Sequence, residues 1–139
     1  MSKKSGKIAE RIAAFQGGEL SAYYLGYFDC FNRQLFYEAH DVLEELWLAD
    51  RYGPNGDFFK GLIQLAGAFV HLQKDRLRPA AALFKLARTN LTKYPPRHQC
   101  LDRAMVLGLI EIWLAWLETS EFIRNPLRDQ PAPELSLVV

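Results

Sequence analysis

The segment 57–74 constrains the fold more than any other part of the chain, because apolar side chains point in nearly every direction around it. At about 100° per residue, only one stripe of such a helix lacks large apolar groups. The apolar residues are Phe58, Phe59, Leu62, Ile63, Leu65, Ala66, Phe69, Val70 and Leu72. A helix that is apolar on most sides has to be surrounded by other elements. The sequence therefore predicts a central helix within a bundle.

Helical periodicity continues through most of the remaining chain, and no run shows the alternation of a half-buried strand. Clusters of Gly, Pro and Asn separate the other predicted helices, which cover 5–15, 19–31, 35–49, 79–94 and 98–120. Asp57 is suited to cap the central helix, and Pro79 suits the first turn of the next one. We predict an all-α, single-domain bundle of about five to six helices over 1–124, followed by an extended C-terminal tail over 125–139.

Composition supports one domain. The chain has 139 residues, and half of them are hydrophobic. That is enough for one core and too short for two ordinary domains. No apolar run reaches the roughly 18 residues of a membrane span, and residues 8–15 are amphipathic, unlike a secretory signal. We therefore expect a cytoplasmic location and no membrane partner. Cys30 and Cys100 are interpreted as core residues and not as a disulfide framework.

Charge is distributed unevenly along the chain, although the net charge is only +1. The segment 29–57 carries seven acids and two bases, and the segment 74–103 carries eight bases and two acids. Such asymmetry is typical of two solvated faces, or of a self-complementary contact between subunits, more than of a nucleic-acid site. We interpret the bases Lys85, Arg88, Lys93 and Arg97 as a solvated face.

Two polar pairs lie on helical faces that the pattern predicts to be dry. His40 and Glu44 are one turn apart at the edge of the buried face of 35–49. Gln64 and His71 lie on the one stripe of the central helix without large apolar groups. A buried polar group without a partner costs about 1–3 kcal/mol. We therefore predict that these four residues oppose and satisfy one another, as a candidate ligand-binding cluster: His40, Glu44, Gln64 and His71.

This cluster has two interpretations. In the first, which we favour, it fixes helix register in a non-catalytic binding or assembly module. In the second, His40, Glu44 and His71 hold a divalent metal in a hydrolase-like enzyme, since two imidazoles and one carboxylate suit zinc or iron. The pattern is neither His-Glu-x-x-His nor the paired Glu-x-x-His of di-iron bundles. The sequence leaves the reaction, the metal and any small-molecule ligand open.

The segment 98–120 is broadly apolar as well, and it contains Trp113 and Trp116. Two such helices are difficult to bury completely in so small a domain. We predict a homodimer through this segment. The alternative is that its apolar face packs inside the monomer against the first two helices.

Two of these segments resemble a known family. They are Tyr37-Glu-Ala-His-Asp-Val-Leu-Glu-Glu-Leu-Trp47 and Lys60-Gly-Leu-Ile-Gln-Leu-Ala-Gly-Ala-Phe-Val-His71. Together they are similar to the helical family called domain of unknown function 309, over about residues 27–96. That family usually has Glu after the histidine, where this chain has Asp41. The resemblance implies an all-helical fold in which one helix is packed round by the rest, and it implies no activity or cofactor.

Overall fold

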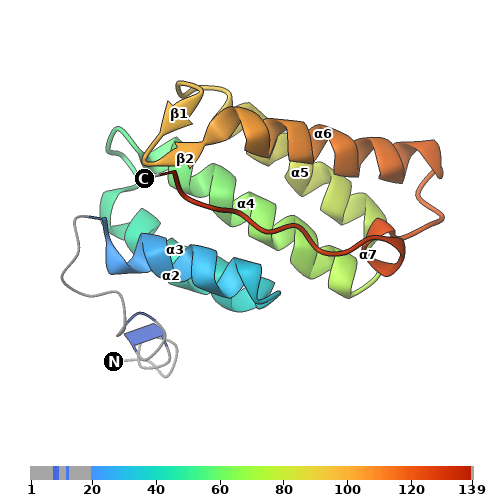
Figure 1. Ribbon diagram of the computed structural model, residues 1–139, viewed down its shortest axis with the longest axis horizontal. Coiled ribbons are helices and arrows are strands. Elements are labelled where there is room, and N and C mark those ends of the chain that lie inside the picture. The colour runs from blue at the N-terminus through green and yellow to red at the C-terminus, as the bar shows by residue number, and fades with distance from the viewer. Residues whose placement is uncertain (1–7, 10–11, 13–19, 139) are drawn as a thin grey trace.

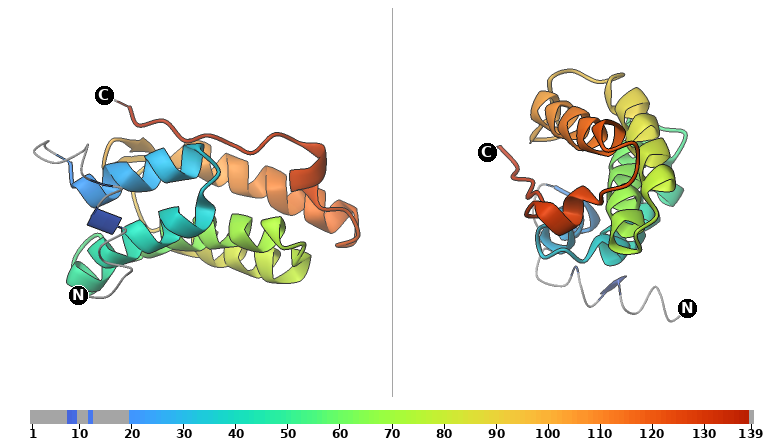
Figure 2. Two further views of the ribbon diagram at one scale, coloured as in Figure 1. Left: turned by 90° about the horizontal axis from the view of Figure 1, so that it is seen from below. Right: turned by 90° about the vertical axis from the view of Figure 1, so that its right-hand side faces the viewer.

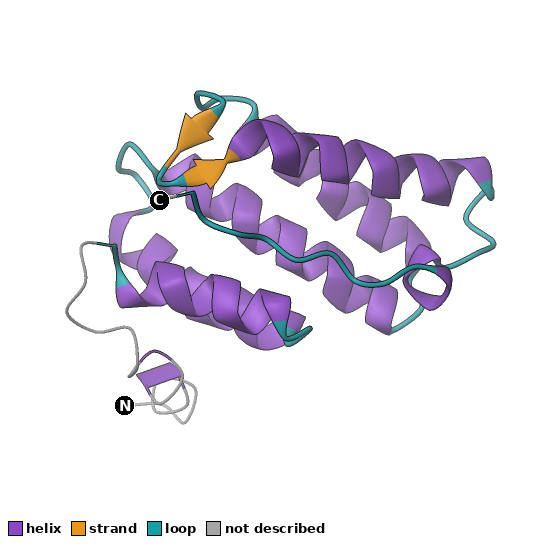
Figure 3. Ribbon diagram, in the orientation of Figure 1, coloured by secondary structure: helices purple, strands orange, loops and turns teal. Residues whose placement is uncertain are grey.

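The computed structural model describes residues 8–9, 12 and 20–138 (Figure 1). Within these residues helices predominate, joined by loops, one small two-stranded hairpin and an extended C-terminal segment (Figure 3). The elements in chain order are α2 (Ala22–Asn32), α3 (Phe36–Asp50), α4 (Gly56–Gln73), α5 (Leu77–Leu91), β1 (Arg97–His98), β2 (Leu101–Asp102), α6 (Arg103–Thr119) and α7 (Pro126–Asp129). This confirms the all-α bundle. The helix predicted over 5–15 lies outside the described residues, apart from three positions of which Ile8 and Ile12 are buried.

The helix α4 is the central element of the bundle, as predicted. Twelve of its residues are buried, on nearly all of its circumference, and α3 and α5 pack along it (Figure 1). The ring of Phe69 has four aromatic neighbours, one each from α2, α3, α5 and α6. Their centroids lie 4.9–5.6 Å away, and the residues are Phe31, Phe36, Phe84 and Trp113. A single α4 side chain thus reaches four surrounding helices.

Small residues let α5 approach α4 closely. A Cβ atom at Gly61 would lie 2.9 Å from Cγ of Leu91, and one at Gly67 would lie 3.1 Å from Cδ1 of Leu83. The first distance is well below the optimal carbon–carbon separation of about 3.5–4.0 Å, so a larger residue at 61 would push α5 away. The side of α4 that carries Gly61 and Gly67 therefore packs against α5, which the sequence left open.

The boundaries of two helices differ from the prediction. The helix α4 begins at Gly56, and Asn55 takes the N-cap position. Asp57 does not cap the helix, because its Oδ2 accepts a hydrogen bond from Nζ of Lys93 at 2.9 Å. The helix α6 begins at 103 and not at 98, and its cap is Asp102, whose Oδ1 accepts from the Met105 amide at 3.0 Å.

A small β-hairpin occupies the residues before α6, where the sequence predicted helix. Its two strands are two residues long, too short to produce a recognisable alternation. The hairpin places His98 in a half-buried position. The imidazole centroid lies 4.8 Å from that of Phe58 and 4.9 Å from that of Tyr94, and its Nε2 lies 2.6 Å from Oδ1 of Asn55. Burial lowers the pKa of His98.

The C-terminal segment returns along the bundle toward the hairpin (Figure 2). A short helix, α7, interrupts the extended tail predicted over 125–139, and its cap is Asn125, whose Oδ1 accepts from the Leu127 amide at 3.0 Å. The later residues are extended. Leu135 is buried, and its backbone exchanges hydrogen bonds of 2.7 and 2.8 Å with the Asn32 side chain. The tail therefore contributes to the core.

Two predictions from composition have direct counterparts in the structure. Among the described helices, none has both the length and the apolar character needed to cross a bilayer. Neither cysteine is in a disulfide; Cys30 is buried as predicted, whereas Cys100 is exposed. The core interpretation was wrong for Cys100, because this residue lies in the turn of a hairpin and not in the predicted helix.

Candidate functional site

His40 lies on α3 between two carboxylates. Its Nδ1 lies 3.2 Å from Oδ1 of Asp41, and its Nε2 lies 3.7 Å from Oε2 of Glu44, one turn further along. The side chains of His40 and Glu44 are 32 % and 29 % exposed. The Tyr37 ring stacks beside the imidazole at 6.4 Å. The structure therefore brings His40 and Glu44 together at a half-buried edge that is open to solvent.

Asp41 is a member of this site that the sequence analysis missed. Helical angles place it on the wet side of α3, yet its side chain is only 17 % exposed. Neighbouring residues on a helix do not ordinarily face each other, so the pattern contained no signal for its contact with His40. The signal lay in the family resemblance, because this is the position at which that family usually has Glu.

Trp47 continues the same surface one turn beyond Glu44. Nζ of Lys60, on α4, lies 5.9 Å from the indole centroid, and Cζ of Arg51 lies 6.0 Å from it. Cations at this distance are attracted by the ring face. We call the surface formed by four α3 residues the α3 polar strip: His40, Asp41, Glu44 and Trp47. It offers an imidazole, two carboxylates and an indole to solvent on one helix.

Gln64 finds its partner on α5 and not on α3. Nδ2 of Asn90 donates a hydrogen bond to Oε1 of Gln64 at 2.8 Å. Nζ of Lys93 donates to Oδ1 of Asn90 at 3.3 Å and to Oδ2 of Asp57 at 2.9 Å. Asn90 is buried, so this connected chain of hydrogen bonds fixes α4 against α5. Asn90 was missed, although it is a lone polar residue on an apolar helical face.

His71 lies near the C-terminal end of α4. Its Nδ1 is buried and has no hydrogen-bond partner among the residues that the structure describes. Burial lowers the pKa of His71, and the charges of Arg76 and Lys74 lower it further. Of the four predicted residues, the structure thus pairs His40 with Glu44, joins Gln64 to Asn90, and leaves the His71 Nδ1 outside both pairs.

A metal site would need several such groups to converge. Over 20–138 and the three described positions before it, no three His, Cys, Asp or Glu side chains are arranged to hold a metal ion. The metal-ligand set of His40, Glu44 and His71 therefore stays a prediction. Of these three residues, only His40 and Glu44 lie at ion-pair distance from each other.

The helix α6 presents a surface of different character. Its inner side is in the core, where Val106, Ile110, Trp113, Leu114 and Leu117 are buried. On its outer side, Met105, Ile112 and Trp116 are 41 %, 51 % and 38 % exposed. We call this surface the α6 outer face, and it consists of exposed residues on one side of the helix: Ala104, Met105, Gly108, Ile112, Ala115, Trp116 and Thr119.

Paired charges line the rim of the α6 outer face. Nη1 of Arg88 lies 2.8 Å from Oε1 of Glu111, and Nζ of Lys85 lies 3.8 Å from Oε1 of Glu118. The bases are on α5 and the acids on α6. The four bases predicted to form a solvated face do lie at the surface, but three of them are ion-paired, because Lys93, just after α5, also pairs with Asp57.

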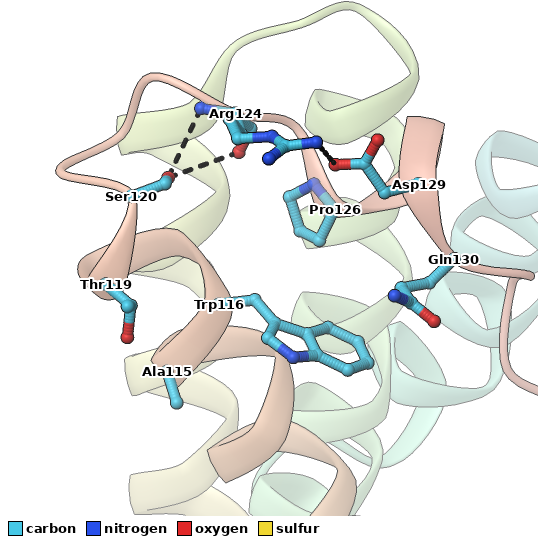
Figure 4. Close-up of a pocket in the computed structure, with 8 residues that line it drawn as sticks. All are labelled: Ala115, Trp116, Thr119, Ser120, Arg124, Pro126, Asp129 and Gln130. Atoms are coloured by element: carbon cyan, nitrogen blue, oxygen red, sulfur yellow. Dashed lines mark hydrogen bonds and ion pairs between the residues drawn. The ribbon is translucent and has the colours of Figure 1, made fainter.

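A hollow lies where α6 ends and α7 begins (Figure 4). Its volume is about 530 Å³, and it is lined by Ala115, Trp116, Thr119, Ser120, Arg124, Pro126, Asp129 and Gln130. The indole of Trp116 and the ring of Pro126 face each other across it. An ion pair of 3.3 Å between Arg124 and Asp129 lies at its edge. The hollow thus has an aromatic wall that continues the α6 outer face.

The fold and these surfaces define a small all-α bundle with one central helix, a polar strip on α3 and an apolar outer face on α6. The model of the family described as Domain of unknown function (DUF309) matches residues 24–83. The chain resembles that family over most of α2, all of α3 and α4, and the first part of α5, a region that contains the α3 polar strip and Gln64 but not Asn90. The match stops within α5, earlier than the predicted 96, and it excludes α6. Comparisons with curated proteins and with solved structures give no significant match.

Proposed function

We propose that this protein is a non-catalytic assembly module that associates with a second copy of itself through the α6 outer face. The observation that supports this is the exposure of three large apolar side chains on one side of a helix, Met105, Ile112 and Trp116. They recur at spacings of seven and four residues, so they share one helical face. A contiguous exposed apolar surface is typical of a protein interface.

The charges beside this face also permit a second copy to approach. In a twofold dimer the same patch is used by both subunits, so it has to be compatible with itself. Unpaired charges of one sign at the rim would repel their own copies. Glu111 and Glu118 are instead paired with bases of α5, and each copy brings a rim with two acids and two bases.

Light scattering on the full chain at several concentrations tests this proposal. We expect a dimer, and we expect Ile112→Arg to convert it to a monomer, because a charge would be desolvated at the centre of the contact. The matched control is Leu48→Arg on α3, since Leu48 is 49 % exposed and Ile112 is 51 % exposed. A wild-type monomer, or equal behaviour of the two variants, would overturn the proposal.

The α3 polar strip supports a second candidate function, the binding of a small polar ligand or a divalent cation by His40 and Glu44. The supporting observation is that both side chains are part-exposed and lie 3.7 Å apart. Elemental analysis of protein purified without a nickel column tests the cation. Stoichiometric metal that is lost in His40→Ala, but kept in a Glu38→Gln control, would establish a metal-binding role. Metal-free wild-type protein that also takes up none on titration with zinc would remove it.

A further inference from the structure

We infer that the two copies pair through antiparallel α6 helices, with Met105 of each copy entering the hollow beside Trp116 of the other. This arrangement rests on the proposed function, since it specifies how the α6 outer face is used. It assigns an occupant to the hollow in Figure 4 and a role to the unoccupied space around Gly108.

The spacing of residues along α6 is symmetric about Ile112. Gly108 and Trp116 lie four residues before and after it, and Met105 and Thr119 lie seven residues before and after it. If two antiparallel helices cross at Ile112, each Trp116 lies opposite Gly108 of the second copy. Each Met105 then lies opposite Thr119, which lines the hollow. Because the arrangement is twofold, both contacts form twice.

Shape complementarity favours this orientation over the parallel one. A Cβ built at Gly108 meets no atom of the described residues within 4 Å, so the backbone there is accessible to a bulky group. In the antiparallel pair, the large indole of one copy meets this open position of the other. In a parallel pair at the same register, each Trp116 would meet the other Trp116, and each Gly108 would meet the other Gly108. The two indoles would then clash, and the two glycines would leave a gap. Packed interfaces require close complementarity without voids.

The chemistry of Met105 suits the hollow. Its side chain is 41 % exposed, flexible and unbranched, and a thioether makes favourable contacts with aromatic rings. The hollow offers the Trp116 indole, the Pro126 ring and the methyl group of Ala115. Antiparallel helices also place opposite ends of the two helix dipoles together, which is favourable.

Disulfide trapping tests the orientation in the full chain. The background is Cys100→Ser, because Cys100 is the exposed thiol and Cys30 is buried. Two single-cysteine variants, Met105→Cys and Thr119→Cys, are oxidised separately and as an equimolar mixture. A disulfide needs Cβ atoms about 3.5–4.5 Å apart, so we expect the mixture to form 105–119 dimers in clear excess over 105–105 and 119–119 dimers. Predominant 105–105 and 119–119 dimers would overturn the antiparallel arrangement.

The two proposals fail in distinguishable ways. A dimer by light scattering with the wrong disulfide pattern contradicts the orientation alone, whereas a monomer at all concentrations contradicts self-association itself. A second variant, Gly108→Phe, places a ring at this open position, where a built Cβ meets no atom of the described residues within 4 Å. We expect it to weaken dimerisation at least about 10-fold, which corresponds to about 1.4 kcal/mol. Ala82→Phe, at an exposed position of α5, is the control; an unchanged Gly108→Phe dimer would contradict the register.

Discussion

The α3 polar strip and the α6 outer face are both part-exposed helical surfaces, but their side chains are satisfied differently. In the strip, His40 has two carboxylate neighbours on its own helix, and Trp47 lies beside cations from α3 and α4. On α6, the charged rim is paired within the chain, whereas the large apolar groups of the face remain exposed.

This difference follows from the range of the forces involved. A polar group is satisfied by one partner at hydrogen-bond or ion-pair distance, and a neighbouring turn can provide that partner. An apolar group is stabilised in proportion to the area that it removes from water, at about 25 cal/mol per Å². Ile112 lies outside the core of the described residues, and 51 % of its surface remains exposed. The comparison agrees with local pairing for the α3 polar strip and with the proposed second copy for the α6 outer face.

The largest expected effect is a loss of stability on substitution in the core, and it contrasts the core with the α6 outer face. Phe69→Ala should lower the free energy of unfolding by about 3–5 kcal/mol, because it removes a ring packed against four others. Ile112→Ala should change it by less than about 0.5 kcal/mol in the monomer, as for other exposed sites. Urea unfolding, at a protein concentration too low for the dimer to form, measures the free energy of unfolding of both variants. Similar losses in the two variants would show that Ile112 belongs to the core.

The next effect concerns the hydrogen-bonded pair of Gln64 on α4 and Asn90 on α5. Asn90→Ala should destabilise the fold by about 1–3 kcal/mol, because Oε1 of Gln64 loses its donor at a part-buried contact between the two helices. A cycle with Gln64→Ala and the double variant should give a coupling energy of about 0.5–1.5 kcal/mol. Thermal unfolding followed by circular dichroism provides the values. Additive losses would mean that the two side chains contribute independently.

An intermediate effect is a dependence of stability on pH that arises from two histidines outside the α3 polar strip. Burial lowers the pKa of both His71 and His98 in the folded protein. The unfolded chain, with an ordinary pKa of about 6.5, therefore takes up protons first as the pH falls. Stability should be highest above about pH 6.5 and should decrease as the pH falls toward the lowered values.

Urea titrations between pH 5 and pH 8 measure this dependence. Substituting both histidines by Gln should make the free energy of unfolding nearly independent of pH in that range. Each single variant should remove part of the pH dependence. A His40→Gln variant is the control from the polar strip. A slope that is unchanged in the double variant would assign the effect to other groups.

The smallest expected effect is the coupling energy between His40 and Glu44 in the α3 polar strip. A double-mutant cycle of His40→Ala and Glu44→Ala should give a coupling of about 0.3–0.5 kcal/mol or less, as for other part-exposed pairs one turn apart. The matched control is the cycle for Arg33 and Asp29, an i,i+4 pair at 3.5 Å on α2. A coupling several times larger for His40 and Glu44 would indicate a more strongly organised site than a helical pair.

The fold was largely predictable because its main signal is periodic. The all-round apolar pattern of 57–74 identified the central helix, and the one-turn spacing identified the pair of His40 and Glu44. The hairpin at Arg97–Asp102 was not predictable, since strands of two residues carry no period. Asn90 was not predicted either, because helical angles identify which side of a helix a residue occupies without identifying the neighbour that it meets.

The sequence by itself determined that the chain forms an all-α bundle around one helix, because side-chain period and helix-breaking residues act over a few neighbouring positions. Tertiary structure decided which helix the polar stripe of α4 faces: Gly61 admits α5 at close range, and Gln64 therefore bonds to Asn90. It also decided which side of α6 stays exposed. Both outcomes depend on contacts between residues far apart in the chain, and these are set by how whole helices pack together.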